Sequence, residues 1–118
     1  MQAIREDMVV ACEYLEREHA IVAEHDGHIA GYAIMRVDAS QAYLRDLFVE
    51  PSFMRSSVGT LLFDRMLLDA RECGAKRLTL TADPYAVGFY ERYGMREIGR
   101  EPSTYVPGRT LPVLALDL

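Results

Sequence analysis

The sequence predicts a single α/β (α+β) domain in which helices pack on one mixed sheet, and three observations carry this prediction. Three extended segments follow one another with short links, which is typical of an antiparallel meander. An amphipathic helical pattern separates the third extended segment from the fourth, so these two strands are expected to lie parallel. A chain of 118 residues allows one modest core, and the domain is therefore expected to span residues 1–118.

The first half of the chain is expected to hold one helix and three strands. Apolar residues at helical spacing predict an amphipathic helix over residues 2–17. Asp26 and Gly27 are expected to form a hairpin turn, and Pro51 to end the third strand because proline cannot continue a strand ladder. The three strands are expected over residues 19–25, 28–37 and 42–49.

The second half is expected to alternate helices and strands. A central helix begins near Ser57 and ends at Gly74, which acts as a left-handed cap. A short helix over residues 85–93 begins with Asp83 as its N-cap and Pro84 as its first residue. The remaining strands are expected over residues 76–81, 95–100 and 111–118.

Composition and charge exclude several classes of protein. The net charge is −5, and residues 1–30 carry seven acidic and two basic side chains, so nucleic acid is not an expected partner. The acidic segment suits either a cationic partner or a solvated helix face. No apolar run reaches the roughly 18 residues that span a bilayer, and the N-terminus lacks a secretory pattern. We therefore expect a cytoplasmic protein without a membrane partner, whose Cys12 and Cys73 are buried and reduced.

The segment from Leu44 to Leu62, LRDLFVEPSFMRSSVGTLL, is the most informative in the chain. It joins a strand through a small polar turn directly to the start of the central helix. Unpaired backbone N–H groups and the positive end of the helix dipole then meet at one point, which suits a phosphate group. The turn matches neither a Walker loop nor the dinucleotide-binding fingerprint. Taken alone, it is explained equally well by an ordinary capped helix start.

A second segment, DPYAVGFYERYGM at residues 83–95, gives the first segment a family context. The stretch PSFMRSSVGTLL, preceded by LFVE, resembles the signature of the GNAT superfamily of acyl-CoA-dependent N-acetyltransferases. The second segment resembles that family's N-x-x-A-x-x-F-Y-x-x-x-G-F element at the matching distance. The resemblance implies a GNAT-like mixed central sheet flanked by helices, with the usual first strand and first helix missing from this chain.

The resemblance also implies a site for acetyl-CoA as cosubstrate. In the family, the strand before the loop separates from its parallel neighbour and leaves main-chain groups free for the pantetheine arm, here those of Leu47, Phe48 and Val49. The amides that hold the pyrophosphate correspond to those of Arg55, Ser56, Ser57, Val58, Gly59 and Thr60. Asp83 corresponds to an asparagine that contacts the arm, and Phe89 and Tyr90 to the aromatic pair beside the thioester.

Three positions depart from the family's pattern. Met54 stands where the family usually has glutamine or arginine, and it removes a polar contact. Ser57 replaces the first glycine of the loop, which costs backbone freedom but keeps the main-chain N–H. Asp83 replaces the asparagine, and either places an anion near the cofactor or caps its helix.

The implied chemistry is direct attack of an amine on the thioester, with no metal and no covalent enzyme intermediate. The N–H of Val49 is the candidate that polarises the carbonyl. Tyr90 is the candidate that protonates the leaving thiolate, because a phenol is protonated at pH 7; its alternative is a packed core tyrosine. Asp46 is the candidate base, with an exposed ion pair to Arg45 or Arg36 as its alternative.

The sequence assigns no catalytic or metal-binding role to four other positions. Leu78 occupies the position where some family members have a glutamate base. His19, His25 and His28 are expected on the surface around the first hairpin, because their spacing suits no metal site.

The sequence thus predicts an enzyme that moves an acetyl group from acetyl-CoA to a primary amine of a small molecule or a protein. The alternative is a non-catalytic acyl-CoA-binding sensor or degenerate partner subunit, favoured by Met54, Ser57 and the lack of a clear base. A structural interaction domain without cofactor is a third reading. A homodimer is also predicted, because a free sheet edge invites cover by a second subunit.

Overall fold

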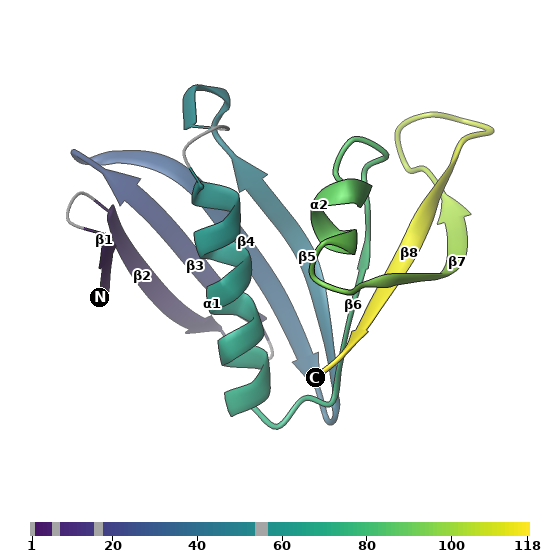
Figure 1. The fold of residues 1–118 in the computed structure, drawn as a ribbon, viewed down its shortest axis with the longest axis horizontal. Coiled ribbons are helices and arrows are strands. Elements are labelled where there is room, and N and C mark those ends of the chain that lie inside the picture. The colour runs from purple at the N-terminus through teal and green to yellow at the C-terminus, as the bar shows by residue number, and fades with distance from the viewer. Residues whose placement is uncertain (1, 6–7, 16–17, 54–56) are drawn as a thin grey trace.

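One mixed sheet forms the frame of the computed structural model, which describes residues 2–5, 8–15, 18–53 and 57–118 (Figure 1). Of residues 2–5 and 8–15 the backbone alone is described. The strands lie in the spatial order β1-β2-β3-β4-β5-β6-β8-β7, which confirms the predicted α+β architecture with a mixed sheet. The strands are β1 (Gln2–Arg5), β2 (Met8–Leu15), β3 (Glu18–His25), β4 (His28–Asp38), β5 (Gln41–Val49), β6 (Arg77–Thr81), β7 (Arg96–Pro102) and β8 (Thr110–Asp117). The helices are the 3-10 turn η1 (Pro51–Phe53), α1 (Val58–Glu72) and α2 (Val87–Glu91).

The helix predicted over residues 2–17 is wrong, because the described part of this segment forms β1 and β2. β2 pairs antiparallel with β3, from Val9 opposite Glu24 to Leu15 opposite Glu18. The β-branched neighbours Val9 and Val10 favour a strand. Pairing also satisfies the backbone groups along an edge of β3 that a helix would leave open, and this gain outweighs a weak helical period. The expectation that a first strand is missing is therefore also wrong.

The predicted meander of three strands is confirmed as β3, β4 and β5, each antiparallel to the next. Asp26 and Gly27 join the first two with φ angles of 50° and 77°, the positive values that a type I′ hairpin turn requires. Gly31 in β4 lets the backbones of β4 and β5 approach closely. A Cβ atom at Gly31 would lie 2.5 Å from the carbonyl oxygen of Phe48, so no other residue fits there without movement.

β5 and β6 lie parallel, as predicted, but they pair over a short stretch only. Gln41 lies opposite Arg77 and Leu44 opposite Leu80, where the ladder ends. Residues 46–49 of β5 continue to pair with β4 on the other side, past a bulge in that ladder at Arg45. The two parallel strands therefore separate at the end of β5 that leads into α1.

Both helices pack on one face of the sheet, with α1 across β3 and β4 and α2 beside β5 and β6 (Figure 1). α1 follows Ser57 and ends before Gly74, whose φ of 85° confirms the predicted left-handed cap. The largest side chains of α1 in the core are those of Leu62, Phe63 and Met66, each fully buried. Cys73, at the end of α1, is exposed, so the expectation that it is buried is wrong.

α2 is shorter than the predicted helix over residues 85–93. Asp83 caps a turn that precedes α2: its carboxylate accepts a hydrogen bond from the Tyr85 N–H (3.0 Å) and its carbonyl accepts one from the Ala86 N–H (2.8 Å). None of the helices in the described ranges is long and apolar enough to cross a membrane.

Candidate functional site

A cavity of about 470 Å³ lies where β5 separates from β6, between the start of α1 and α2. It brings together the end of β5, the start of α1 that follows it in the chain, and the α2 region, which is distant from both in the sequence. Its described lining residues are Leu47, Val49, Ser57, Gly59, Thr60, Tyr85, Ala86, Phe89, Tyr90 and Arg92. Seven of the residues that the sequence singled out are therefore in one place, namely Leu47, Val49, Ser57, Gly59, Thr60, Phe89 and Tyr90.

The main chain of β5 offers free groups to this cavity. The Glu50 N–H donates to the carbonyl of Ala30 in β4 (2.8 Å), so it points away from β6. Because successive N–H groups of a strand alternate in direction, those of Val49 and Leu47 point to the side from which β6 has separated. This is the arrangement that the family resemblance implies for the pantetheine arm.

The start of α1 contributes three further N–H groups. The first intrahelical bond runs from Leu61 N–H to the Ser57 carbonyl (3.0 Å), and the Ser57 side chain makes no capping bond. The N–H groups of Val58, Gly59 and Thr60 therefore precede the helical ladder, at the positive end of the helix dipole. The Val58 side chain is buried, so only its main chain can serve a ligand. Arg55 and Ser56 lie outside the described residues.

Gly59 keeps the cavity open at its base. A Cβ atom at Gly59 would lie 3.6 Å from Val49 Cγ2 and 3.9 Å from the Phe89 ring, at ordinary contact distance. A methyl group there would thus be tolerated by the protein while filling space beside the free amides.

The wall opposite α1 is aromatic. The Phe89 ring packs against Tyr90 and Phe63, with centroid distances of 5.2 and 5.9 Å. Tyr90 is 7% exposed, and burial raises the pKa of its phenol to about 12. Tyr90 therefore holds its proton at neutral pH and reaches both the core and the cavity.

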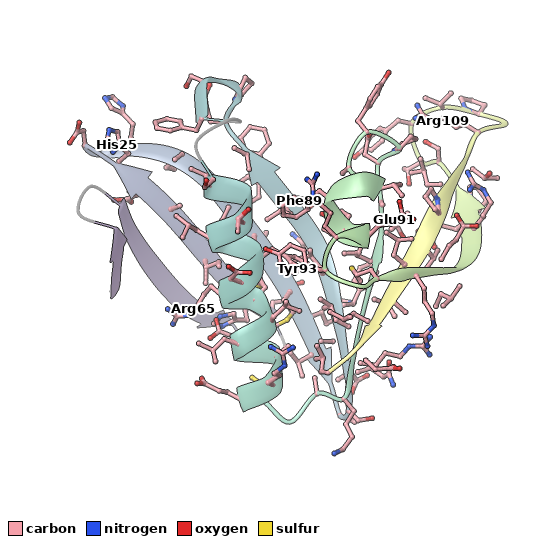
Figure 2. All side chains as sticks on the ribbon, viewed as in Figure 1. His25, Arg65, Phe89, Glu91, Tyr93 and Arg109 are labelled. Atoms are coloured by element: carbon pink, nitrogen blue, oxygen red, sulfur yellow. The ribbon has the colours of Figure 1, made fainter. Side chains whose placement is uncertain are left out.

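Tyr93 ties α2 to α1. Phe89 and Tyr93 extend from the α2 region toward α1 (Figure 2). The Tyr93 hydroxyl donates to Asp64 Oδ1 in α1 (2.8 Å), and its ring lies 4.6 Å from that of Phe63. Partial burial and the neighbouring Asp64 carboxylate raise the pKa of Tyr93 to about 12. This bond fixes the distance between two walls of the cavity.

Asp46 and Phe48 lie on the opposite face of the sheet. Strand alternation places them away from Leu47 and Val49, and the Phe48 ring packs on Tyr32 (5.4 Å) on that face. Asp46 Oδ2 lies 3.0 Å from Arg45 Nε, which forms the exposed ion pair that the sequence left as an alternative to a base. For Phe48, only the main chain is near the cavity.

Two other sequence candidates lie outside the cavity lining. Asp83 is engaged in the turn before α2. Leu78 is fully buried in β6, so no base stands at the position where some family members carry glutamate.

His19 is a correction to the sequence analysis, which expected it on the surface. It is 2% exposed, and its Nε2 lies 2.5 Å from Oδ2 of Asp69, which is equally buried in α1. His28 is exposed, and His25 lies beside Phe53 and Asp26 at the hairpin tip. In the part of the chain that the structure describes, no cluster of His, Cys, Asp or Glu side chains is arranged to hold a metal ion.

Sequence reasoning missed Ala86 and Arg92 as lining residues, whereas it had left open that Tyr85 lines a pocket. The signal for Arg92 was its position three residues after Phe89, which places both on one side of a helical turn.

Comparison with known proteins identifies the family. A family model described as the acetyltransferase (GNAT) domain matches residues 2–108. The chain belongs to this family. A Bacillus subtilis (strain 168) protein named "putative ribosomal protein bS18-alanine N-acetyltransferase" is 30% identical to this GNAT chain over 90 residues, which cover 74% of the chain and 60% of that protein.

Solved GNAT structures share the fold. The ribosomal-protein-S18-alanine N-acetyltransferase of Escherichia coli superposes with a TM-score of 0.77 at 25% identity, covering 88% of this chain and 71% of that one. A GNAT family acetyltransferase of Elizabethkingia anophelis, solved with acetyl-CoA bound, gives a TM-score of 0.82 at 13% identity and covers 97% of this chain and 100% of that one.

Proposed function

We propose that this GNAT chain transfers an acetyl group from acetyl-CoA to a primary amine. The observation that carries the proposal is the meeting of three features at one cavity: the free amides of β5, the unbonded N–H groups at the start of α1 and the protonated Tyr90 phenol. The residues present fit acetyl-CoA, because the amides suit a diphosphate and the apolar side chains of Leu47, Val49 and Phe89 suit the arm.

Each group has a distinct task in this proposal. Bound acetyl-CoA supplies a thioester whose carbonyl carbon is open to attack by an amine. The Val49 N–H stabilises negative charge on the carbonyl oxygen, and the Tyr90 hydroxyl donates its proton to the departing sulfur. Asp46, the candidate base from the sequence, pairs with Arg45 on the face of the sheet opposite the cavity, so in this proposal the amine proton leaves to water.

The names of the relatives suggest the first acceptor to test. Two of them are named for acetylation of an alanine of ribosomal protein S18. We therefore propose a protein N-terminus that begins with alanine as the first candidate acceptor, with small primary amines as the comparison set.

A non-catalytic acyl-CoA-binding module is the second candidate function. Two observations favour it: Leu78 is buried where a base stands in some relatives, and Asp46 is held in an ion pair. Such a module would bind acetyl-CoA without turning it over.

Calorimetric titration with acetyl-CoA and coenzyme A, followed by an assay of thiol release with the amine panel, tests the proposal. We expect binding, turnover with at least one amine, and loss of turnover without loss of binding in Tyr90→Phe. Gly59→Ala is expected to weaken binding while the fold is retained, because the added methyl fits the protein but fills the cavity. Binding without turnover, with an inert Tyr90→Phe substitution, would support the module instead. Absence of binding would refute both.

A further inference from the structure

Tyr93 makes a hydrogen bond that its ring contacts do not require. The ring packs with centroid distances of 4.6 Å to Phe63 and 5.5 Å to Phe89, and a phenylalanine would keep both contacts. The hydroxyl is the additional group, and it donates to Asp64 Oδ1 in α1 at 2.8 Å. In Figure 2, Tyr93 is directed from the segment after α2 toward α1. The hydroxyl therefore adds a directional link between two elements that the rings already pack together.

The same hydroxyl also bonds to the side chain of Thr60, one turn before Asp64 in α1. A carboxylate has no proton to give, so Tyr93 donates its single proton to Asp64, and the Thr60 hydroxyl donates to the Tyr93 oxygen. The pKa of Tyr93 agrees with these directions, because burial and the Asp64 bond raise it and the Thr60 bond lowers it, with a net value of about 12. Two residues near the start of α1 thus hold one oxygen atom.

This link connects the two ends of the proposed chemistry. Thr60 lines the cavity and carries one of the free N–H groups at the start of α1. On the other side, the Tyr93 N–H donates to the Tyr90 carbonyl at 3.0 Å, which ties the backbone of Tyr93 to that of Tyr90. Tyr93 itself is not among the described lining residues of the cavity. Its influence on a bound ligand therefore passes through Thr60 and Tyr90.

We propose that Tyr93 is a positioning residue, whose hydrogen bonds to Thr60 and Asp64 set the distance between the amides of α1 and the Tyr90 phenol. This inference rests on the proposed transfer reaction, in which the amides hold the diphosphate and Tyr90 protonates the sulfur. One flexible arm joins the diphosphate to the sulfur, so the phenol meets the sulfur most often when the protein fixes the spacing of its own groups. Tyr93 fixes that spacing without contacting the cofactor.

Separate measurements of turnover and of binding in Tyr93→Phe test this role. We expect kcat with acetyl-CoA to fall about tenfold or more, because a small misplacement of a catalytic group costs up to about a hundredfold in rate. The dissociation constant of coenzyme A should stay close to the wild-type value, since the amides and the cavity lining remain. Tyr105→Phe, at a ring that is 92% exposed between β7 and β8, is the matched loss of a hydroxyl and should change neither quantity.

Asp64 supplies a second variant that leaves the aromatic rings intact. Asp64→Ala removes the acceptor and should lower kcat, and its combination with Tyr93→Phe should cost no more than Tyr93→Phe alone, because both remove the same bond. Asp64→Asn keeps an acceptor oxygen, so it should recover most of the turnover that Asp64→Ala loses. Glu72→Ala, at an exposed carboxylate of the same helix, is the matched control.

The Tyr90→Phe background separates positioning from a merely structural role. Introduced there, Tyr93→Phe should lower kcat no further, since the hydroxyl that it positions is already absent. The ring resonances of Tyr90 in protein with isotope-labelled tyrosine add a readout besides turnover. In wild type they should differ between the complexes with coenzyme A and with desulfo-coenzyme A, which lacks the sulfur, and Tyr93→Phe should reduce this difference.

Wild-type kcat in Tyr93→Phe would overturn the positioning role, and so would a loss of kcat that persists in the Tyr90→Phe background. In either case the proposed function stands if wild type transfers the acetyl group. If wild type binds coenzyme A without turnover, the proposed transfer fails, and an unreduced difference in the Tyr90 resonances would then overturn the positioning role as well. Failure of wild type to bind coenzyme A would refute both.

Discussion

At the scale of single residues, Ser57 shows how one backbone angle prepares the candidate site. It stands where the family resemblance places a glycine, and its φ of 70° and ψ of 13° lie in the left-handed region. This confirms that the position demands the freedom of glycine, which serine lacks. The strained turn leads directly into the three free N–H groups of α1. The conformational free energy that this backbone angle costs is therefore located at the candidate site.

Ser57→Gly is therefore expected to stabilise the protein. Relief of the left-handed conformation contributes roughly 1–2 kcal/mol, and the greater freedom of glycine in the unfolded chain offsets about half of this, which leaves a net gain of about 0.5–1 kcal/mol. Urea unfolding measures it. Ala39→Gly, at a second non-glycine position with positive φ (54°), should give a similar gain away from the cavity. A loss of stability in Ser57→Gly would contradict the strain.

Tyr90 is expected to control turnover without limiting the pH range in which the protein is active. Its pKa is raised to about 12 by burial, against 10 in the unfolded chain, so the phenol stays protonated through pH 9. The stability linked to this shift is present below pH 10 and is lost as the pH rises through 12. Tyr90→Phe should lower turnover by about a hundredfold or more, measured by thiol release, with Tyr105→Phe, at an exposed tyrosine between β7 and β8, as the control. A fall in wild-type turnover near pH 8 that Tyr90→Phe abolishes would contradict this assignment.

At the scale of elements, a buried polar cluster holds α1 on the sheet. His19 in β3 contacts Asp69 in α1 at 2.5 Å, and Arg65, one turn earlier in α1, reaches both oxygens of the same carboxylate at 3.0 and 3.2 Å. Figure 2 places Arg65 on the side of α1 that faces the N-terminal strands. The cluster fixes the direction of α1 and hence the direction in which its N-terminal amides point.

Asp69→Asn is expected to destabilise the fold by about 3 kcal/mol, because it removes the charge that compensates a buried partner. Glu72→Gln, an exposed carboxylate on the same helix, should change the free energy of unfolding by less than about 0.5 kcal/mol. Thermal and urea unfolding of both variants measure the difference. Equal changes in the free energy of unfolding would show that the buried cluster stabilises the fold no more than an exposed carboxylate does.

At the scale of the whole molecule, the helices leave one face of the sheet uncovered among the described residues. Tyr32 and Phe48 form an exposed aromatic pair on that face, and β1 and β7 are the outermost strands of the sheet. Open strands and exposed rings are places where a second chain can pair. This arrangement keeps a homodimer as our prediction, with β1 as a free edge of the sheet.

Sedimentation velocity at high micromolar concentration tests the dimer. We expect a species of twice the chain mass that dissociates on dilution. Phe48→Glu, which places a charge on the open face, should lower the dimer fraction if this face is the interface, and Tyr105→Glu on the exposed loop should not. A single monomeric species at all concentrations would contradict the prediction.

The same three scales separate what was predictable from what was not. The hairpin at Asp26 and Gly27, the end of β5 before Pro51 and the cap at Gly74 were predicted because each depends on neighbouring residues alone. The two segments that carried the family resemblance do line one cavity in the structure. The state of residues 2–17, by contrast, was mispredicted, because a helical period and a strand pattern coexist there and the contact with β3 decides between them.

The sequence by itself determined the strand–turn–helix order around the candidate site, since turn, cap and proline chemistry act over a few residues. Only the tertiary structure decided that His19 is buried against Asp69 and that Tyr85 and Arg92 share a cavity wall with the start of α1. The physical reason is that these contacts join residues distant along the chain. Burial and long-range pairing belong to the assembled sheet and its helices, and no local pattern encodes them.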